Sequence, residues 1–142
     1  MQTVNDNLLI FLVVRKNKYY QMNYRILYIE DEEPNAILLK ELALRRGWDF
    51  KWYSCADTFL KMANISDYDI IFVDWKMPGM DGLELCKIIR SKSSIPLIIC
   101  TAYAFVSDKE KALQIADDYF PKPPLAEEFY RLVEKYCRNN AS

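Results

Sequence analysis

Two short runs of the chain, residues 68–74 and 95–101, are apolar at consecutive positions rather than at alternating ones. Runs of this kind are typical of parallel strands that helices cover on both faces. Residues 24–30 form another strand-like apolar run, and two shorter segments, residues 50–54 and 118–121, complete a set of five predicted strands.

Segments with helical signals separate these strands. Pro34 suits the first position of a helix, and Gly47 suits the position that follows its last turn. Asp81, followed three residues later by Glu84, is a capping-box pattern. The predicted helices cover residues 34–47, 56–63, 81–90, 107–116 and 125–137.

The order of these elements predicts an α/β fold. Five strands that alternate with five helices favour a doubly wound, five-stranded parallel sheet with right-handed crossovers and helices on both faces. For a chain of 142 residues, the flavodoxin-like strand order 2-1-3-4-5 is the natural form. We expect one folded domain over residues 24–138, an N-terminal extension of unknown role over 1–23 and a C-terminal tail over 139–142.

Composition narrows the function classes. Hydrophobic residues make up 51% of the chain and charged residues 27%, as in an ordinary globular protein. The net charge of −1 offers no broad electrostatic footprint for nucleic acid, so we expect no nucleic-acid partner. Histidine is absent, which excludes histidine bases and histidine zinc sites and requires any phosphohistidine to come from another molecule. The four cysteines form no C-x-x-C pair, which indicates reduced thiols in a cytoplasmic protein.

The N-terminal extension contains an apolar stretch, residues 8–14, that is far too short to span a bilayer. Its basic residues Arg15, Lys16 and Lys18 follow the stretch, and no small-residue cleavage site is present, so we expect neither a secretory signal nor stable membrane insertion. Two interpretations stay open: an extension that packs locally, and a weak contact with a membrane surface or a partner.

Polar residues stand where the predicted strands end. Glu30 and Asp31 end the first strand, Asp74 ends the third, Thr101 ends the fourth, and Lys122 follows the fifth. In the order 2-1-3-4-5 the first and third strands are neighbours, roughly 4.8 Å apart, so the three carboxylates converge at one edge of the sheet. Carboxylates this close repel one another unless a cation intervenes.

A hard divalent cation resolves this conflict. Mg²⁺ suits the position better than zinc, because it prefers oxygen ligands, whereas the chain has no histidine and no cysteine near these acids. We therefore predict a magnesium site at Glu30, Asp31 and Asp74. The alternative is that these acids only favour a helix start, which explains Glu32 and Glu33 but not acids at the ends of two buried strands.

The position of Asp74 suggests phosphoryl chemistry. A carboxylate is ionised at neutral pH and can attack phosphorus to give an aspartyl phosphate. Phosphoryl transfer requires mainly positioning and neutralisation of charge. Mg²⁺, the Lys122 ammonium and the Thr101 hydroxyl would each take one phosphoryl oxygen.

Four motifs occur in order along the chain: ILYIEDEEPN (26–35), DIIFVDWKMPGMDGLEL (69–85), LIICTAYA (97–104) and DDYFPKPP (117–124). On these motifs the chain resembles the receiver domain of bacterial-type response regulators, over about residues 25–138. The stretch DWKMPGMDG is by itself nearly diagnostic of that family. Because the chain ends just after the last predicted helix, we expect a stand-alone receiver.

The resemblance implies roles for the acids and for their neighbours. Asp74 would be the phosphoacceptor, and Glu30, Asp31 and Asp74 would hold Mg²⁺ together with the backbone carbonyl of Lys76. We also expect Lys76 and Tyr103 to border the approach of the water that hydrolyses the aspartyl phosphate; the alternative is that both side chains point to solvent and have no effect. We expect the two side chains to obstruct that water, so that self-dephosphorylation is slow.

The resemblance also implies how the signal is read. Thr101 and Lys122 would contact the phosphoryl group, and Tyr119 would be the aromatic residue that turns inward on activation. The peptide bond between Lys122 and Pro123 is expected to be cis. Output is expected on the face made by the fourth helix, the fifth strand and the fifth helix. One departure affects the loop after the fourth helix, where Ile115 occupies a position at which the family usually has glycine.

The partners follow from the same resemblance. A histidine kinase or a histidine phosphotransfer protein would donate the phosphoryl group, and a downstream protein would read it. The protein would not be an enzyme beyond its own phosphorylation and autodephosphorylation. As a relay station between phosphohistidine proteins or as an output switch, it would act through protein contacts.

Three other interpretations of the sequence are alternatives to a receiver domain. A Mg²⁺-dependent phosphatase of the haloacid-dehalogenase type usually has a second acid two residues after its nucleophile, and here that residue is Lys76. A flavodoxin would have to bind its phosphate at EDEEP, whose acids repel phosphate in the absence of a metal. A scaffold that is never phosphorylated would lack the acid pair or the acceptor, and both are present.

Overall fold

The computed structural model describes residues 22–102 and 106–138. Within these residues, strands and helices alternate along the chain. The elements, in chain order, are β1 (Arg25–Ile29), α2 (Glu33–Arg45), β2 (Asp49–Tyr53), α3 (Ala56–Met62), the 3-10 helix η1 (Ile65–Asp67), β3 (Ile70–Asp74), α4 (Gly82–Lys92), β4 (Leu97–Thr101), α5 (Val106–Leu113), β5 (Asp118–Pro121) and α6 (Ala126–Arg138). Most element ends lie within two residues of those predicted.

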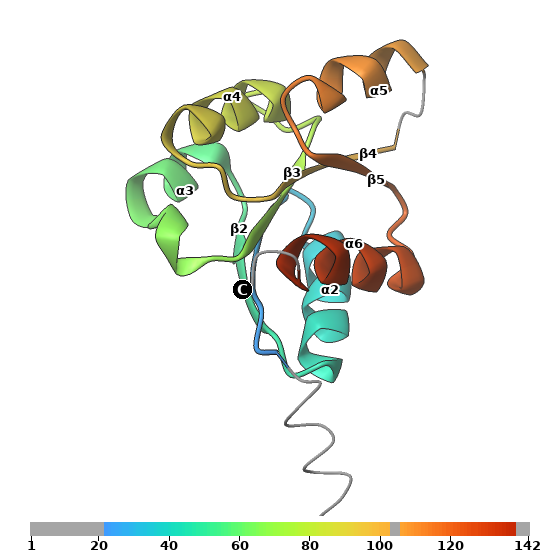
Figure 1. Ribbon diagram of the computed structural model, residues 1–142. Coiled ribbons are helices and arrows are strands. Elements are labelled where there is room, and N and C mark those ends of the chain that lie inside the picture. The colour runs from blue at the N-terminus through green and yellow to red at the C-terminus, as the bar shows by residue number, and fades with distance from the viewer. Residues whose placement is uncertain (1–21, 103–105, 139–142) are drawn as a thin grey trace, which may run out of the picture.

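The strands form one parallel sheet in the order β2-β1-β3-β4-β5, which confirms the predicted flavodoxin-like topology. Helices α2 and α6 cover one face of this sheet, and α3, α4 and α5 cover the other (Figure 1). Because both faces are covered, β3 and β4 are buried along their whole length. This burial explains why their sequences are apolar at consecutive positions.

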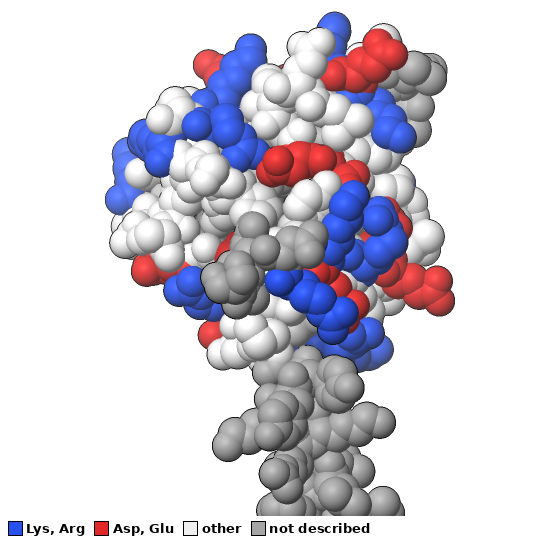
Figure 2. Space-filling model, in the orientation of Figure 1, with Lys and Arg blue, Asp and Glu red and all other residues white. Residues whose placement is uncertain are grey.

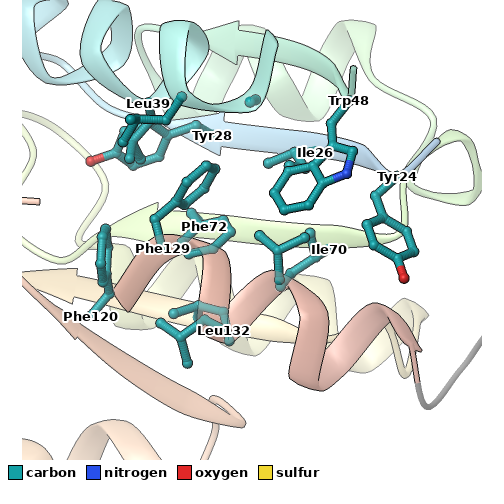
Figure 3. Close-up of a cluster of buried hydrophobic side chains, with 14 of the residues drawn as sticks. Tyr24, Ile26, Tyr28, Leu39, Trp48, Ile70, Phe72, Phe120, Phe129 and Leu132 are labelled. Carbon is teal, nitrogen blue, oxygen red and sulfur yellow. The ribbon is translucent and has the colours of Figure 1, made fainter. Parts of the chain in front are cut away.

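The layer between the sheet and helices α2 and α6 is rich in aromatic rings (Figure 3). Phe72 of β3 lies at its centre, with ring centroids 5.4 Å from Phe129 of α6 and 5.7 Å from Phe120 of β5. Tyr28 of β1 meets Phe72 edge-on, at 6.4 Å. Pairs in such tilted and edge-to-face geometry contribute beyond their buried area. This layer therefore anchors the three strands from which the polar residues of the sheet edge project.

The opposite layer is mainly aliphatic. It contains Ile29 of β1 and Val73 of β3, which pack with Phe59 of α3, Leu85 of α4 and Ala112 of α5, all nearly or fully buried. The alternation of side chains along each strand sends successive residues of β1 and β3 into one layer or the other. Both faces of the strands therefore contribute to a core.

The loop after α5 has Ile115 at the position where the family usually has glycine, and its geometry does not require glycine. Helix α5 ends at Leu113, three residues earlier than predicted, and Ile115 adopts no positive φ. The Arg90 guanidinium of α4 donates hydrogen bonds to the carbonyls of Ile115 (3.3 Å) and Ile95 (2.9 Å) and to Asp117 (2.8 Å). Arg90 thus satisfies the loop carbonyls without a left-handed turn, which is why a branched residue is tolerated at position 115.

The surface and the cysteines agree with the composition. Figure 2 shows Lys and Arg interspersed with Asp and Glu over the visible face. All four cysteines are free; Cys86, Cys100 and Cys137 are buried, and Cys55 is half-buried. Within residues 22–102 and 106–138, no helix is long and apolar enough to cross a membrane.

Candidate functional site

The carboxyl ends of β1 and β3 bring three acids together. Glu30 and Asp31 follow β1, and Asp74 is the last residue of β3. The two strands are paired, with Ile29 opposite Val73, so the acids emerge at the same edge of the sheet. One carboxylate oxygen from each of the three residues lies within 4.8 Å of the others. The predicted convergence is confirmed.

Glu30 is a fully buried carboxylate, with 0% of its surface exposed. Its Oε2 atom accepts a hydrogen bond from the Tyr28 hydroxyl (2.7 Å) and lies 2.6 Å from Lys122 Nζ. Its Oε1 atom accepts the backbone N–H of Glu32 at 3.2 Å, and its backbone carbonyl accepts the Trp52 indole N–H at 2.6 Å. A buried charge needs this degree of pairing to be tolerated.

Asp74 is nearly buried and lies 3.0 Å from Lys122 Nζ. Burial raises the pKa of Asp74 to about 7; the charge of Glu30 raises it as well, and the hydrogen bond from Lys122 opposes the rise. Burial also lowers the pKa of Lys122, but its hydrogen bonds to Glu30 and Asp74 outweigh that effect, so the pKa is raised overall. The lysine therefore stays charged between two carboxylates.

Thr101 and Lys122 are brought to the same edge by β4 and β5. Thr101 ends β4 and is 2% exposed, and the backbone N–H of Lys122 donates to its carbonyl at 2.9 Å. The preceding residue of β4, Cys100, is opposite Asp74 in the sheet register. The peptide bond between Lys122 and Pro123 is cis, which confirms the prediction.

Tyr119 of β5 is half-buried and packs against the aliphatic layer, next to β4. Its ring lies 5.6 Å from the Nζ atom of Lys109, a residue of α5. Lys76 is exposed, and its Nζ atom lies 5.7 Å from the ring of Trp75. Tyr103 lies outside the described residues, so its predicted role stays a prediction.

Two glycines follow Asp74, one in the loop and one at the start of α4, and they have different structural roles. Gly79 has a φ of +83°, a conformation that glycine adopts at little cost. Gly82, the first residue of α4, lies against the backbone of Asp74 and Trp75, and its N–H donates to the Trp75 carbonyl at 2.8 Å. A Cβ at position 82 would overlap the carbonyl oxygen of Asp74 and would lie 2.7 Å from Trp75 Cα. The start of α4 therefore supports Asp74 directly.

This arrangement matches a known family. The family model described as "Response regulator receiver domain" matches residues 26–134. The chain belongs to the response regulator receiver family. The resemblance suggested by the sequence motifs is thus confirmed, and the family carries the phosphoacceptor role in two-component signalling.

Relatives of this receiver domain include longer regulators. The transcriptional regulatory protein YrkP of Bacillus subtilis (strain 168) is 36% identical over 113 residues, which are 79% of this chain and 48% of YrkP. The sensory transduction protein RegX3 of Mycolicibacterium smegmatis is 34% identical over 117 residues, which are 82% of this chain and 51% of RegX3. The chain therefore spans about half the length of these curated relatives.

Solved receiver structures share the fold. The receiver domain of the Francisella response regulator 1452 superposes with a TM-score of 0.71 at 29% identity, over 82% of this chain and 99% of that one. The chemotaxis protein CheY4 of Vibrio cholerae, at 19% identity, superposes with a TM-score of 0.74 over 81% of this chain and 99% of that one. The second comparison bears on the fold alone.

The residues of this receiver domain fit a magnesium ion. Three carboxylates with one ammonium among them carry a formal charge of −2, and every donor is a hard oxygen. Asp31 is exposed, which leaves the cluster open to solvent on one side. The backbone carbonyl of Lys76 stays a predicted ligand.

Sequence reasoning missed two residues that contact Glu30. Tyr28 and Trp52 look like core aromatics, and both do pack in the aromatic layer. Tyr28 lies two residues before Glu30, a spacing that puts both side chains on one face of a strand. That spacing was the available signal for Tyr28. Trp52 comes from the neighbouring strand β2, so only the sheet register reveals its contact.

The close approach at Gly82 predicts a specific loss of stability. We expect Gly82→Ala to lower the free energy of unfolding by about 2 kcal/mol, because the added methyl group must displace the backbone at Asp74. This loss is expected although alanine favours a helix more than glycine does. Urea unfolding followed by circular dichroism measures it.

Gly79→Ala is the matched control. Its added Cβ meets nothing within 4 Å, so only the positive φ opposes it, at a cost of about 1 kcal/mol. A Gly82→Ala protein as stable as wild type would show that the backbone at Asp74 is not held by this contact.

Proposed function

We propose that Asp74 accepts a phosphoryl group from a phosphohistidine of a histidine kinase or histidine phosphotransfer protein. The observation that carries this proposal is the placement of Lys122 Nζ, 3.0 Å from an Asp74 carboxylate that stands in a cluster of acids. Glu30, Asp31 and Asp74, with the Lys76 carbonyl, would hold Mg²⁺. When bound, the ion would neutralise charge on the phosphoryl oxygens and on the acids.

In the proposed step an Asp74 carboxylate oxygen attacks phosphorus, and a P–O bond forms. The P–N bond to the donor imidazole breaks, and its electron pair stays on the imidazole nitrogen. The Lys122 ammonium faces one phosphoryl oxygen, and the Thr101 hydroxyl donates a hydrogen bond to another. Once Asp74 is ionised, no side chain of this domain has to move a proton, which suits a domain without histidine.

The domain would have no turnover on other substrates. A phosphatase needs a general acid for its leaving group, and Lys76, the residue two after Asp74, is a cation on the exposed surface. A scaffold that is never phosphorylated does not require an acceptor paired with a lysine and two further acids. Both alternatives are therefore less well supported than a phosphoacceptor switch, and the free buried thiols favour the cytoplasm as its compartment.

The proposed output surface consists of α5, β5 and α6. Phosphate at Asp74 would draw Thr101 toward it, and Tyr119, which lies on the adjacent strand, would follow into the space released. Such a change is a shift between existing conformations, so a downstream protein that prefers the active one must also favour phosphorylation. The identity of the donor and of that downstream protein does not enter this mechanism.

The phosphoacceptor assignment is tested by labelling. We expect a small acyl phosphate donor to add one phosphoryl group to the wild-type protein, and only when Mg²⁺ is present. Asp74→Asn should gain none, because the attacking oxygen is lost, whereas the exposed acid of α3 can be changed in Asp57→Asn without effect. Intact-mass spectrometry measures the addition, and labelling that survives Asp74→Asn would mean that another residue is the acceptor.

The coupling through Tyr119 is tested on the same phosphorylated protein. We expect phosphorylation to change hydrogen exchange in β5 and at the ends of α5 and α6, and we expect Tyr119→Ala to abolish that change while labelling at Asp74 persists. Tyr68→Ala is the control, because Tyr68 is a half-buried tyrosine of the same layer, placed before β3. An unaltered exchange response in Tyr119→Ala would refute this route.

The lifetime of the aspartyl phosphate is tested by removing the proposed shield. We expect the double variant Lys76→Asn, Tyr103→Ala to lose phosphate about tenfold faster than wild type, which corresponds to about 1.4 kcal/mol of activation free energy. Both single variants should be intermediate, and Lys87→Asn, at an exposed lysine of α4, should behave as wild type. Rates equal to or slower than wild type in the double variant would contradict the shielding role.

A further inference from the structure

The Tyr28 hydroxyl is a polar group inside the aromatic layer, and it contacts the acidic site from the core side. Tyr28 is 0% exposed, and its hydroxyl donates to Glu30 Oε2 at 2.7 Å. In Figure 3 the ring of Tyr28 lies beside Leu39, and its oxygen points toward the carboxyl ends of the strands. This is a direct contact between the hydrophobic core and one of the three acids.

The ring of Tyr28 has little freedom to move. It meets Phe72 and Phe50 edge-on, with ring centroids 6.4 Å away in both cases. Strand β1, which carries it, is paired on both sides, with β2 and β3. A side chain confined in this way presents its hydroxyl at a defined position.

The same Glu30 oxygen that accepts the Tyr28 hydroxyl also lies 2.6 Å from Lys122 Nζ. Glu30 therefore connects Tyr28 to Lys122. Its Oε2 atom accepts the Tyr28 hydroxyl from the core side and pairs with the lysine that contacts Asp74. The other oxygen, Oε1, faces the start of α2, where it accepts the Glu32 N–H. Two different sets of donors thus fix the plane of the carboxylate.

We propose that Tyr28 is a positioning residue of the phosphoacceptor site, which orients the Glu30 carboxylate and, through it, Lys122. This inference rests on the proposed function. Tyr28 touches neither Asp74 nor a phosphoryl group in this mechanism, and it acts only through Glu30. Partners that orient the ligands of a metal typically change metal affinity or activity 10–100-fold when they are mutated.

Loss of the hydroxyl has a defined consequence. In Tyr28→Phe the buried Glu30 carboxylate keeps Lys122 and the Glu32 N–H but loses its donor from the core, so Oε2 is held less firmly and the position of Lys122 relative to Asp74 is less well defined. The cluster then offers Mg²⁺ a less ordered set of oxygens. Trp52 still donates to the Glu30 carbonyl, so the backbone at position 30 keeps its place.

Two tyrosine-to-phenylalanine variants separate positioning from stability. Tyr130→Phe is matched to Tyr28→Phe, because the Tyr130 hydroxyl also donates a 2.7 Å hydrogen bond, to the Leu42 carbonyl, and its ring packs against the same layer. We expect each variant to lower Tm by roughly 4 °C. Only Tyr28→Phe should weaken Mg²⁺ binding, by about tenfold in calorimetric titration, and slow labelling by an acyl phosphate.

A double-mutant cycle with Glu30→Ala tests the route. Because Tyr28 acts through Glu30, Tyr28→Phe should change Mg²⁺ affinity by less than about twofold in the Glu30→Ala background. The proposal is overturned if Tyr28→Phe binds Mg²⁺ as wild type does, if Tyr130→Phe weakens binding equally, or if the effect is the same in both backgrounds. A wild-type protein that neither binds Mg²⁺ nor becomes labelled would overturn the proposed function as well, and is thereby distinguished from a failure of positioning alone.

Discussion

The contact of Lys122 with two buried carboxylates is the interaction on which the site depends. Glu30 is fully buried and Asp74 nearly so, and both lie within 3.0 Å of one ammonium group. Removing two like charges from water is costly unless a cation and hydrogen-bond donors replace the solvent. The three residues come from β1, β3 and the end of β5, so this compensation exists only when the whole sheet is assembled.

The hydrophobic layers make that assembly rigid. Phe72, Phe120 and Phe129 join β3, β5 and α6 on one face of the sheet, and an aliphatic layer fills the other. Among the described residues, every buried side-chain nitrogen and oxygen atom has a hydrogen-bond partner. A polar cluster whose buried atoms are all hydrogen-bonded and which packs against close-packed rings on its core side has few alternative arrangements, which is the condition for a site that works by positioning.

The same architecture connects the proposed acceptor, Asp74, to the surface. Asp74, Thr101 and Tyr119 lie on the neighbouring strands β3, β4 and β5, and Tyr119 is only half-buried. A change in charge at Asp74 therefore has a short path to the face formed with α5 and α6. Because packed interfaces tend to have discrete arrangements, a small movement at such a site can be converted into a change of surface.

Much of this protein could be predicted from its sequence. Apolar runs mark the strands because burial on both faces leaves no polar position, and acids at the ends of two such runs mark the site because a parallel sheet gathers the carboxyl ends of its strands. The motif DWKMPGMDG contains Gly79 and Gly82, but the sequence does not show that the first adopts a positive φ and the second lies against the backbone of Asp74. The motifs from residue 26 to residue 124 were specific enough to identify the family.

Only the tertiary structure decided which side chains meet. The two-residue spacing of Tyr28 and Glu30 is compatible with one strand face, but it does not show that the Tyr28 ring meets Phe50 and Phe72 edge-on or that its hydroxyl donates to the carboxylate. The capping of the loop at Ile115 by Arg90, 25 residues earlier, was likewise hidden. A sequence pattern indicates whether a position is buried, because burial follows the periodicity of the segment that contains the position. Contacts between segments depend on packing across the sheet, where the shapes of many distant side chains act together.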